Sequence, residues 1–234
     1  MDFLRSRLFL LPNRRESYNF QLYSPDDASR NSLGKRKAMG IIRILIVITL
    51  ALVFAESSEG AAMEEKKVNP SVIIETSLGS ITIELSQDKA PKTVANFLEY
   101  VKAGYFKGTV FHRVIKGFMI QGGGLSADMK NKSTQSPIEN EAPNGLKNAR
   151  GTIAMARTAE IHSATSQFFI NTVDNSSLDH RSKSPDKFGY CVFGKVTSGM
   201  DIVDKIEGVQ TETKGMYQNV PTKPVVITDV QLKN

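Results

Sequence analysis

The sequence predicts a mainly β domain, either a closed barrel or a sandwich, that follows an N-terminal signal or anchor segment. Most of the second part of the chain consists of short runs in which apolar and polar residues alternate, which is typical of strands. Only two stretches show helical spacing, and one apolar run stands near the N-terminus. A chain of 234 residues with 40% hydrophobic residues is long enough for one folded domain and an extension.

The first 69 residues have the character of an export signal and its flanks. Residues 1–38 carry 8 basic and 4 acidic side chains in a loose pattern, and we expect them to be disordered or to be an upstream extension of the gene model. Residues 39–55 form an apolar run interrupted only by Arg43. The 12 residues after Arg43 fit the core of a signal peptide better than a full membrane span.

Two outcomes are open for this segment. Val53-Phe54-Ala55 offers small residues at the two positions that signal peptidase inspects, so we expect either cleavage near Ala55 or retention of residues 39–55 as an anchor. If Met39 were the true start, the segment would be an ordinary secretory signal. The basic flank favours a cytoplasmic N-terminus and a domain in the periplasm or secretory lumen, with membrane contact only through this segment.

Residues 56–69 are polar and predict a tether, and the folded domain follows at 70–234. Residues 72–76 and 80–85 alternate around Leu78-Gly79, which predicts a hairpin. Residues 90–104 then change to helical spacing, with a proline in the first turn and a glycine as the stop.

The next segment predicts two strands. Residues 110–115 are rich in β-branched and aromatic side chains, Lys116-Gly117 supplies the turn, and 118–121 resumes the extended pattern. Because residues two apart in a strand share a face, Met119 and Gln121 point the same way.

Three later segments complete the predicted domain. Gln167 and Phe169 share one face of an apolar run that ends at Ile170. Residues 200–207 carry an apolar stripe at helical spacing, which predicts a second short helix. Residues 224–232 alternate again and predict a last strand.

Three motifs carry a family resemblance: FHRVIKGFMIQGGG at 111–124, GTIAMARTAEIHSATSQFFIN at 151–171 and FGYCVFGKV at 188–196. In this order they closely resemble the cyclophilins, the cyclosporin-binding family of peptidyl-prolyl cis-trans isomerases. Their residues are similar to those of the bacterial branch. The likeness runs from about residue 71 to 232. It implies an eight-stranded closed antiparallel barrel capped by two α-helices, with the active groove on its outer face.

Rotation about an X-Pro bond needs no nucleophile, metal or cofactor. Amide resonance opposes the rotation with a barrier of roughly 18 to 20 kcal/mol. A catalyst needs an apolar pocket for the proline ring and polar groups that hold the peptide. It also needs a hydrogen-bond donor for the proline nitrogen, which regains its lone pair when the amide is twisted. Arg113 can be that donor and Gln121 can hold backbone. The candidates for the pocket are Phe118, Met119, Phe169 and Leu178.

The resemblance assigns the same roles by position and adds Ala156 and Gln167 to the peptide-binding groove. It also places Arg157 and Tyr190 in the groove, where the animal branch has asparagine and histidine, and residues 158–165 run one residue longer than in that branch. Cyclosporin-sensitive members carry a tryptophan immediately before the pocket leucine. This chain has no tryptophan, and Ser177 precedes Leu178. We therefore expect weak cyclosporin binding.

Other classes of function have less support. Residues 70–234 carry 19 basic against 16 acidic side chains, so nothing there indicates nucleic-acid binding. The three histidines lack the spacing of metal ligands. His162-Ser163 with Asp174 lacks a nucleophile elbow, and Cys191 in an apolar run is typical of a buried small hydrophobe.

We expect a monomeric isomerase without a cofactor, acting on proline-containing polypeptide clients that fold after export. The alternative is a chaperone or scaffold module that binds proline-containing segments and turns them over incidentally. Arg113 favours the enzyme, because a pure binder has no need of a donor that acts only on the twisted amide.

Overall fold

The computed structural model describes residues 69–233. The predicted extension, the apolar run and all but the last residue of the predicted tether lie outside these residues. Within the described part, no helix is long and apolar enough to cross a membrane.

The described residues form a mainly β domain with two α-helices, α2 (Pro91–Lys102) and α3 (Met200–Glu207), as predicted. Two short 3-10 helices also occur, η3 (Ala142–Asn144) and η4 (Ser176–Leu178). The strands are β1 (Ser71–Thr76), β2 (Gly79–Leu85), β3 (Arg113–Ile115), β4 (Met119–Gly122), β5 (Thr152–Met155), β6 (Phe168–Asn171), β7 (Val192–Ser198), β8 (Thr211–Lys214), β9 (Tyr217–Pro221) and β10 (Ile227–Leu232).

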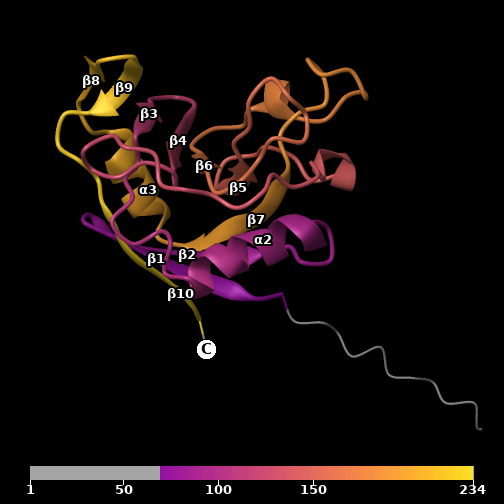
Figure 1. The fold of residues 1–234 in the computed structure, drawn as a ribbon, viewed down its shortest axis with the longest axis horizontal. Helices are drawn as coiled ribbons and strands as arrows, with labels where there is room; N and C mark the ends of the chain where they lie inside the picture. The colour runs from indigo at the N-terminus through magenta and orange to yellow at the C-terminus, as the bar shows by residue number, and fades with distance from the viewer. Residues whose placement is uncertain (1–68, 234) are drawn as a thin grey trace, which may run out of the picture. The chain divides into compact units, whose positions relative to one another are not determined.

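Eight of the strands form one antiparallel sheet in the order β10-β1-β2-β7-β5-β6-β4-β3 (Figure 1). The predicted hairpin is present, because β1 and β2 pair from Ser71↔Glu84 to Thr76↔Gly79. The strands predicted at residues 118–121 and 224–232 correspond to β4 and to β10, which begins at Ile227.

The predicted closed barrel is wrong, because the sheet curls into a half-barrel with β3 and β10 at its two edges. The strand predicted at 110–115 begins only at Arg113. Val110 forms only an isolated bridge, with Val226, and Phe111 and His112 belong to no strand. Backbone hydrogen bonds also join residues 108–111 to residues 225–227, but they do not form a ladder between the two edges.

The two helices pack on the sheet through apolar stripes. In Figure 1, α2 lies beside β10 and the first strands, and α3 lies near β3 and β4. Phe97 of α2 reaches the centre of the core, where its ring lies 5.1 Å from Phe106 and 5.3 Å from Phe193 between centroids. The Glu141 carboxylate accepts hydrogen bonds from the backbone N–H groups of Lys92 and Thr93, which satisfies orphan donors at the start of α2.

The hairpin of β8 and β9 stands outside this sheet. The sequence analysis did not predict it, since residues 211–214 are all exposed and show no apolar alternation. The hairpin lies beside β3, at the end of the sheet where the candidate site begins (Figure 1).

Candidate active site

Strand register places a row of predicted site residues on the outer face of the sheet. Arg113 on β3 pairs with Gln121 on β4, and Gln121 pairs with Phe169 on β6. Directly paired residues on antiparallel strands share a face. The row continues through Ala154 to Val192, and these apolar residues form a small cluster separate from the main core.

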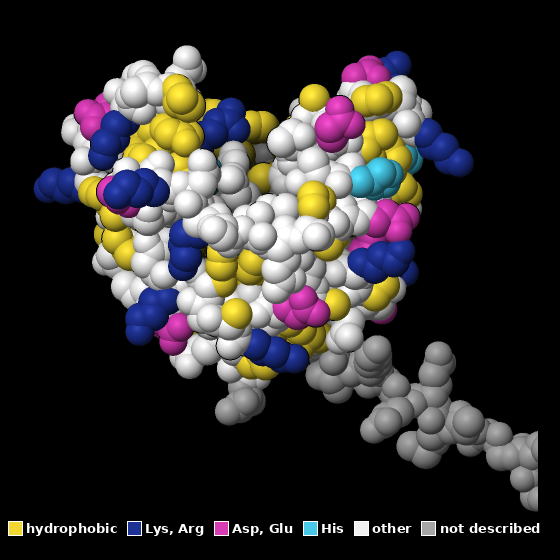
Figure 2. Space-filling model, in the orientation of Figure 1, with side chains coloured by type: hydrophobic (Ala, Val, Ile, Leu, Met, Phe, Trp, Pro, Cys, Tyr) yellow, Lys and Arg dark blue, Asp and Glu magenta, His cyan; other side chains and the backbone are white. Residues whose placement is uncertain are grey.

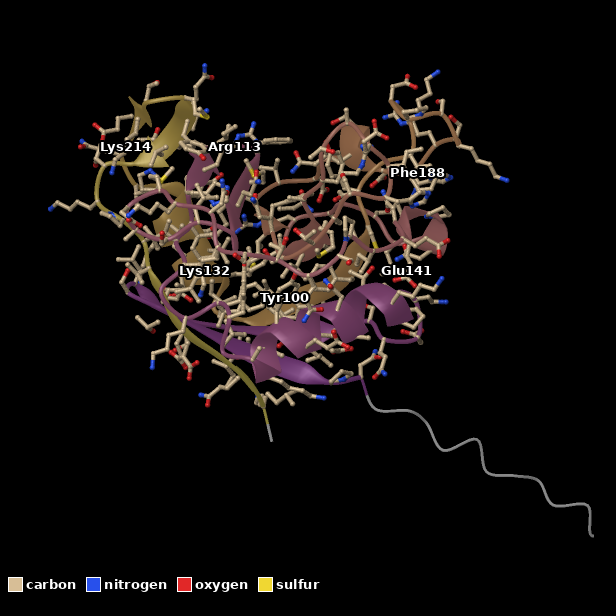
Figure 3. The ribbon with its side chains drawn as sticks, in the orientation of Figure 1. Tyr100, Arg113, Lys132, Glu141, Phe188 and Lys214 are labelled. Carbon is tan, nitrogen blue, oxygen red and sulfur yellow. The ribbon has the colours of Figure 1, made fainter. Side chains whose placement is uncertain are left out.

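A cavity of about 230 Å³ opens on this face. Figure 2 shows the surface hollowed between two raised parts of the molecule, where Figure 3 labels Arg113. Nine of the ten predicted site residues line the cavity: Arg113, Phe118, Met119, Gln121, Ala156, Arg157, Phe169, Leu178 and Tyr190. Gln167 is absent from this lining and instead lines two neighbouring cavities.

The floor of the cavity is apolar. Met119 and Phe169 are almost fully buried, at 2% and 4% exposure, and Phe118 and Leu178 are half-buried beside them. The Tyr190 ring meets Phe169 edge to face, with 5.7 Å between centroids. This floor can hold a small apolar ring away from water.

Two polar side chains at the edge of the cavity form a connected pair. Arg113 is exposed, and its Nη1 donates to Gln121 Oε1 at 3.4 Å. Gln121 Nε2 in turn donates to Gln167 Oε1 at 3.0 Å, which orients the amide. Among residues 69–233, no carboxylate forms an ion pair with Arg113. Its charge and the N–H donors not bonded to Gln121 are therefore available to a ligand.

Arg157 is held by the protein's own backbone. Its guanidinium donates to the carbonyls of Thr158 at 2.9 Å, Pro185 at 3.1 Å and Gly189, the last through Nε at 3.0 Å. It also lies over the Tyr190 ring, 4.9 Å from the centroid. Arg157 thus joins two loops and fixes the aromatic wall of the cavity.

A buried polar network supports the cavity from below. Asp179 Oδ1 accepts from the backbone N–H of Asn148 at 2.8 Å. Asn148 Oδ1 accepts from Asn171, and Asn175 Nδ2 donates to Asn171 Oδ1 and to the carbonyl of Phe118. The sequence analysis missed this network, because isolated asparagines give no periodic signal.

His112 lies beneath the polar pair and was not predicted as a site residue. It is 5% exposed, and its Nδ1 has no hydrogen-bond partner. Burial, together with the positive charge of Arg113, lowers the pKa of this imidazole to about 4. The ring is therefore neutral at physiological pH.

The glycine triplet at residues 122–124 allows close packing of the backbone. A Cβ on Gly123, which has φ 83, would lie 2.8 Å from the Phe168 ring, and a Cβ on Gly124 would lie 2.4 Å from Gln167 Cγ. Both glycines let the chain after β4 approach β6.

Cys191 is buried, as predicted, and burial raises the pKa of its thiol to about 11. It is therefore a poor nucleophile. No group of three His, Cys, Asp or Glu side chains suited to a metal ion occurs within the part of the chain that the structure describes.

Known proteins resemble this chain over the whole described domain. The family model for cyclophilin type peptidyl-prolyl cis-trans isomerase/CLD matches residues 71–232. Peptidyl-prolyl cis-trans isomerase A of Dickeya dadantii is 49% identical over 200 residues, covering 86% of this chain and 98% of that protein. Peptidyl-prolyl cis-trans isomerase B of Escherichia coli is 57% identical over 159 residues, covering 68% and 97%.

Solved structures agree on the fold. A crystal structure of a Cryptosporidium parvum cyclophilin type peptidyl-prolyl cis-trans isomerase is 28% identical, with a TM-score of 0.59, and covers 71% of this chain and 98% of its own. A second crystal structure of that isomerase, obtained in the presence of the dipeptide Ala-Pro, gives a TM-score of 0.58 with the same identity, covering 70% and 99%.

Proposed function

This chain belongs to the cyclophilin-type peptidyl-prolyl cis-trans isomerases and is such an isomerase, and we propose that the Arg113 cavity performs the reaction. The observation that carries the proposal is the position of the Arg113 guanidinium, which forms no ion pair within residues 69–233, beside an apolar floor of the right size for a proline ring.

The apolar floor binds the proline. Phe118, Met119, Phe169 and Leu178 surround the pyrrolidine ring, and burying its methylene groups supplies about 0.8 kcal/mol for each group. The ring then stays fixed while the residue before it rotates. The crystal structure of the Cryptosporidium relative was obtained in the presence of the dipeptide Ala-Pro. A ligand of that size is consistent with the dimensions of the Arg113 cavity.

Arg113 stabilises the twisted amide. In the planar ground state the nitrogen lone pair is delocalised into the carbonyl, so the nitrogen is a poor hydrogen-bond acceptor. At the transition state this delocalisation is lost and the nitrogen regains a lone pair. A guanidinium N–H that reaches this nitrogen binds the transition state more tightly than either planar isomer, which lowers the barrier.

Gln121 and Ala156 hold the peptide backbone next to the proline. Gln167 acts through Gln121, because its Oε1 fixes the orientation of the Gln121 amide. Arg157 and Tyr190 complete the wall, with Tyr190 held between Arg157 and Phe169. The clients are proline-containing polypeptides, and the reaction requires no cofactor.

Replacing Arg113 by alanine tests the mechanism. We expect kcat/KM for an X-Pro peptide to fall by about 100-fold or more, the scale for losing one transition-state donor. The fold should survive, because the Arg113 side chain is exposed. The matched control is Lys116→Ala, which removes an exposed cation three residues away. Near-normal activity in a folded Arg113→Ala protein would remove this arginine from the mechanism.

The isomerase acts outside the cytoplasm. The basic flank, the 12-residue apolar stretch and Val53-Phe54-Ala55 support this part of the proposal. Its substrates are then newly exported chains, in which slow X-Pro isomerisation limits folding.

A further inference from the structure

A second cavity adjoins the proline cavity on the far side of Arg113. Its volume is about 400 Å³. Arg113 and Gln121 line both cavities, so this pair of side chains lies between the two. An extended peptide that places its proline in the first cavity can therefore pass over Arg113 and reach the second.

The outer wall of the second cavity is the turn of the β8–β9 hairpin. Gly215, with φ 62, and Met216 form its two-residue turn between the paired residues Lys214 and Tyr217. This geometry leaves the Met216 side chain 87% exposed, although it lines the cavity. Met216 thus offers an apolar side chain to a ligand at the mouth of this cavity, where Leu125 and Tyr217 also line it.

The lining offers apolar contacts and disfavours a cationic side chain. Leu125, Met216 and Tyr217 supply apolar surface, and Asn131, Gln218 and Asn219 supply neutral amides. Among the described residues that line this cavity, the charged one is Arg113, and no carboxylate is present. A large apolar side chain can bury itself here, whereas a lysine or arginine would face Arg113 without a partner.

We propose that this cavity is a specificity subsite that binds a large apolar client residue near the proline, with Met216 as its main contact. The inference rests on the proposed function of the Arg113 cavity. It makes the β8–β9 hairpin, which lies beside β3 but outside the main sheet (Figure 1), part of client selection.

The test compares peptides by NMR exchange spectroscopy, which needs no coupled protease. A short peptide with one X-Pro bond is extended by a few residues at either end, in two series. Each added position carries Leu, Ala or Lys in turn. We expect one added position in one of the two series to respond. At that position, Leu should raise kcat/KM about fivefold relative to Ala, and Lys should give no increase relative to Ala.

Two variants then identify the contact. In Met216→Asp the preference for Leu should disappear and Lys should become the favoured residue, a reversal that a merely structural change would not produce. In Leu78→Asp, which places the same charge at an exposed apolar residue of the β1–β2 turn, the Leu preference should persist.

The proposed function and the subsite are overturned by different outcomes. If the wild-type protein does not isomerise the short peptide, the proposed function fails and the subsite fails with it. If the short peptide is isomerised but Leu gives no gain at any position, the subsite alone is wrong. Persistence of the Leu preference in Met216→Asp would likewise overturn it.

Discussion

The side-chain amide of Asn175 donates a 2.8 Å hydrogen bond to the backbone carbonyl of Phe118. The same nitrogen donates to Asn171 Oδ1 on β6 at 2.7 Å, so one buried amide joins the turn before η4 to two sides of the groove. Asn175 is only 7% exposed, which leaves these acceptors little access to water. Phe118, which belongs to the apolar floor of the proline pocket, is thus positioned by a residue 57 positions away in sequence.

Removing this amide should affect both stability and activity. In Asn175→Ala the buried Asn171 Oδ1 loses its donor and the Phe118 carbonyl keeps only the backbone N–H of Thr172, so we expect the free energy of unfolding to fall by about 2 kcal/mol. We also expect kcat/KM to fall by about tenfold, mainly through KM, because Phe118 shifts while Arg113 stays in place. Denaturant titration and peptide kinetics measure the two effects.

The neighbouring substitution Ser176→Ala is the control, since that side chain is exposed. Asn175→Asp keeps the shape of the side chain but replaces the donor by acceptors, so it should resemble Asn175→Ala. A stable Asn175→Asp protein with unchanged KM would show that Phe118 does not depend on this bond.

Buried His112 should make stability depend on pH. Its pKa is lowered from 6.5 to about 4 in the folded protein, because burial and the charge of Arg113 both oppose protonation. Between these values the unfolded chain binds more protons than the folded one, so stability decreases as pH falls through this window. The full loss attributable to His112 is on the order of 3 kcal/mol.

Urea titrations of the wild-type protein and His112→Gln at a series of pH values test this. The variant should lose less stability than the wild type between pH 6.5 and pH 4, since its amide does not titrate. Parallel losses in the two proteins would assign the pH dependence to other groups.

Cyclosporin should bind weakly. Ser177 stands in η4 immediately before Leu178, at the position where sensitive family members carry a tryptophan, and this chain contains no tryptophan. Loss of the indole donor and its apolar surface should weaken binding by at least about 100-fold relative to a tryptophan-bearing member. Ser177→Trp should recover part of the affinity in calorimetric titrations.

Ser176→Trp is the matched control, because it adds the same ring at the adjacent exposed position. Tight binding by the unmodified protein, or equal gains in both variants, would show that another residue controls recognition of the drug.

Export can be tested on the intact chain. A reporter fused after residue 69 should be active only outside the cytoplasm, and N-terminal sequencing of the mature protein should find cleavage near Ala55. Deletion of residues 39–55 should leave the reporter in the cytoplasm. Full-length protein in the soluble cytosolic fraction would defeat this part of the proposal.

Local patterns predicted most of the elements and pointed to residues that line one cavity. Alternation predicted the β1–β2 hairpin, helical spacing predicted α2 and α3, and period two placed Met119 and Gln121 on one face. These predictions succeeded because each depends on neighbours a few positions apart in the chain. The motifs then indicated the family, and with it the roles expected for Arg113 and the pocket.

Only the tertiary structure decided whether the sheet closes into a barrel and which contacts support the candidate site. The sheet remains a half-barrel because residues 110–112 reach the start of β10 through an isolated bridge and not a ladder, and local alternation does not encode such a long-range pairing. The bond from Asn175 to Phe118 and the position of the β8–β9 hairpin beside Arg113 depend on contacts between distant segments. Local periodicity carries information about which face a residue occupies, whereas the partner across the fold is fixed only when the whole chain packs.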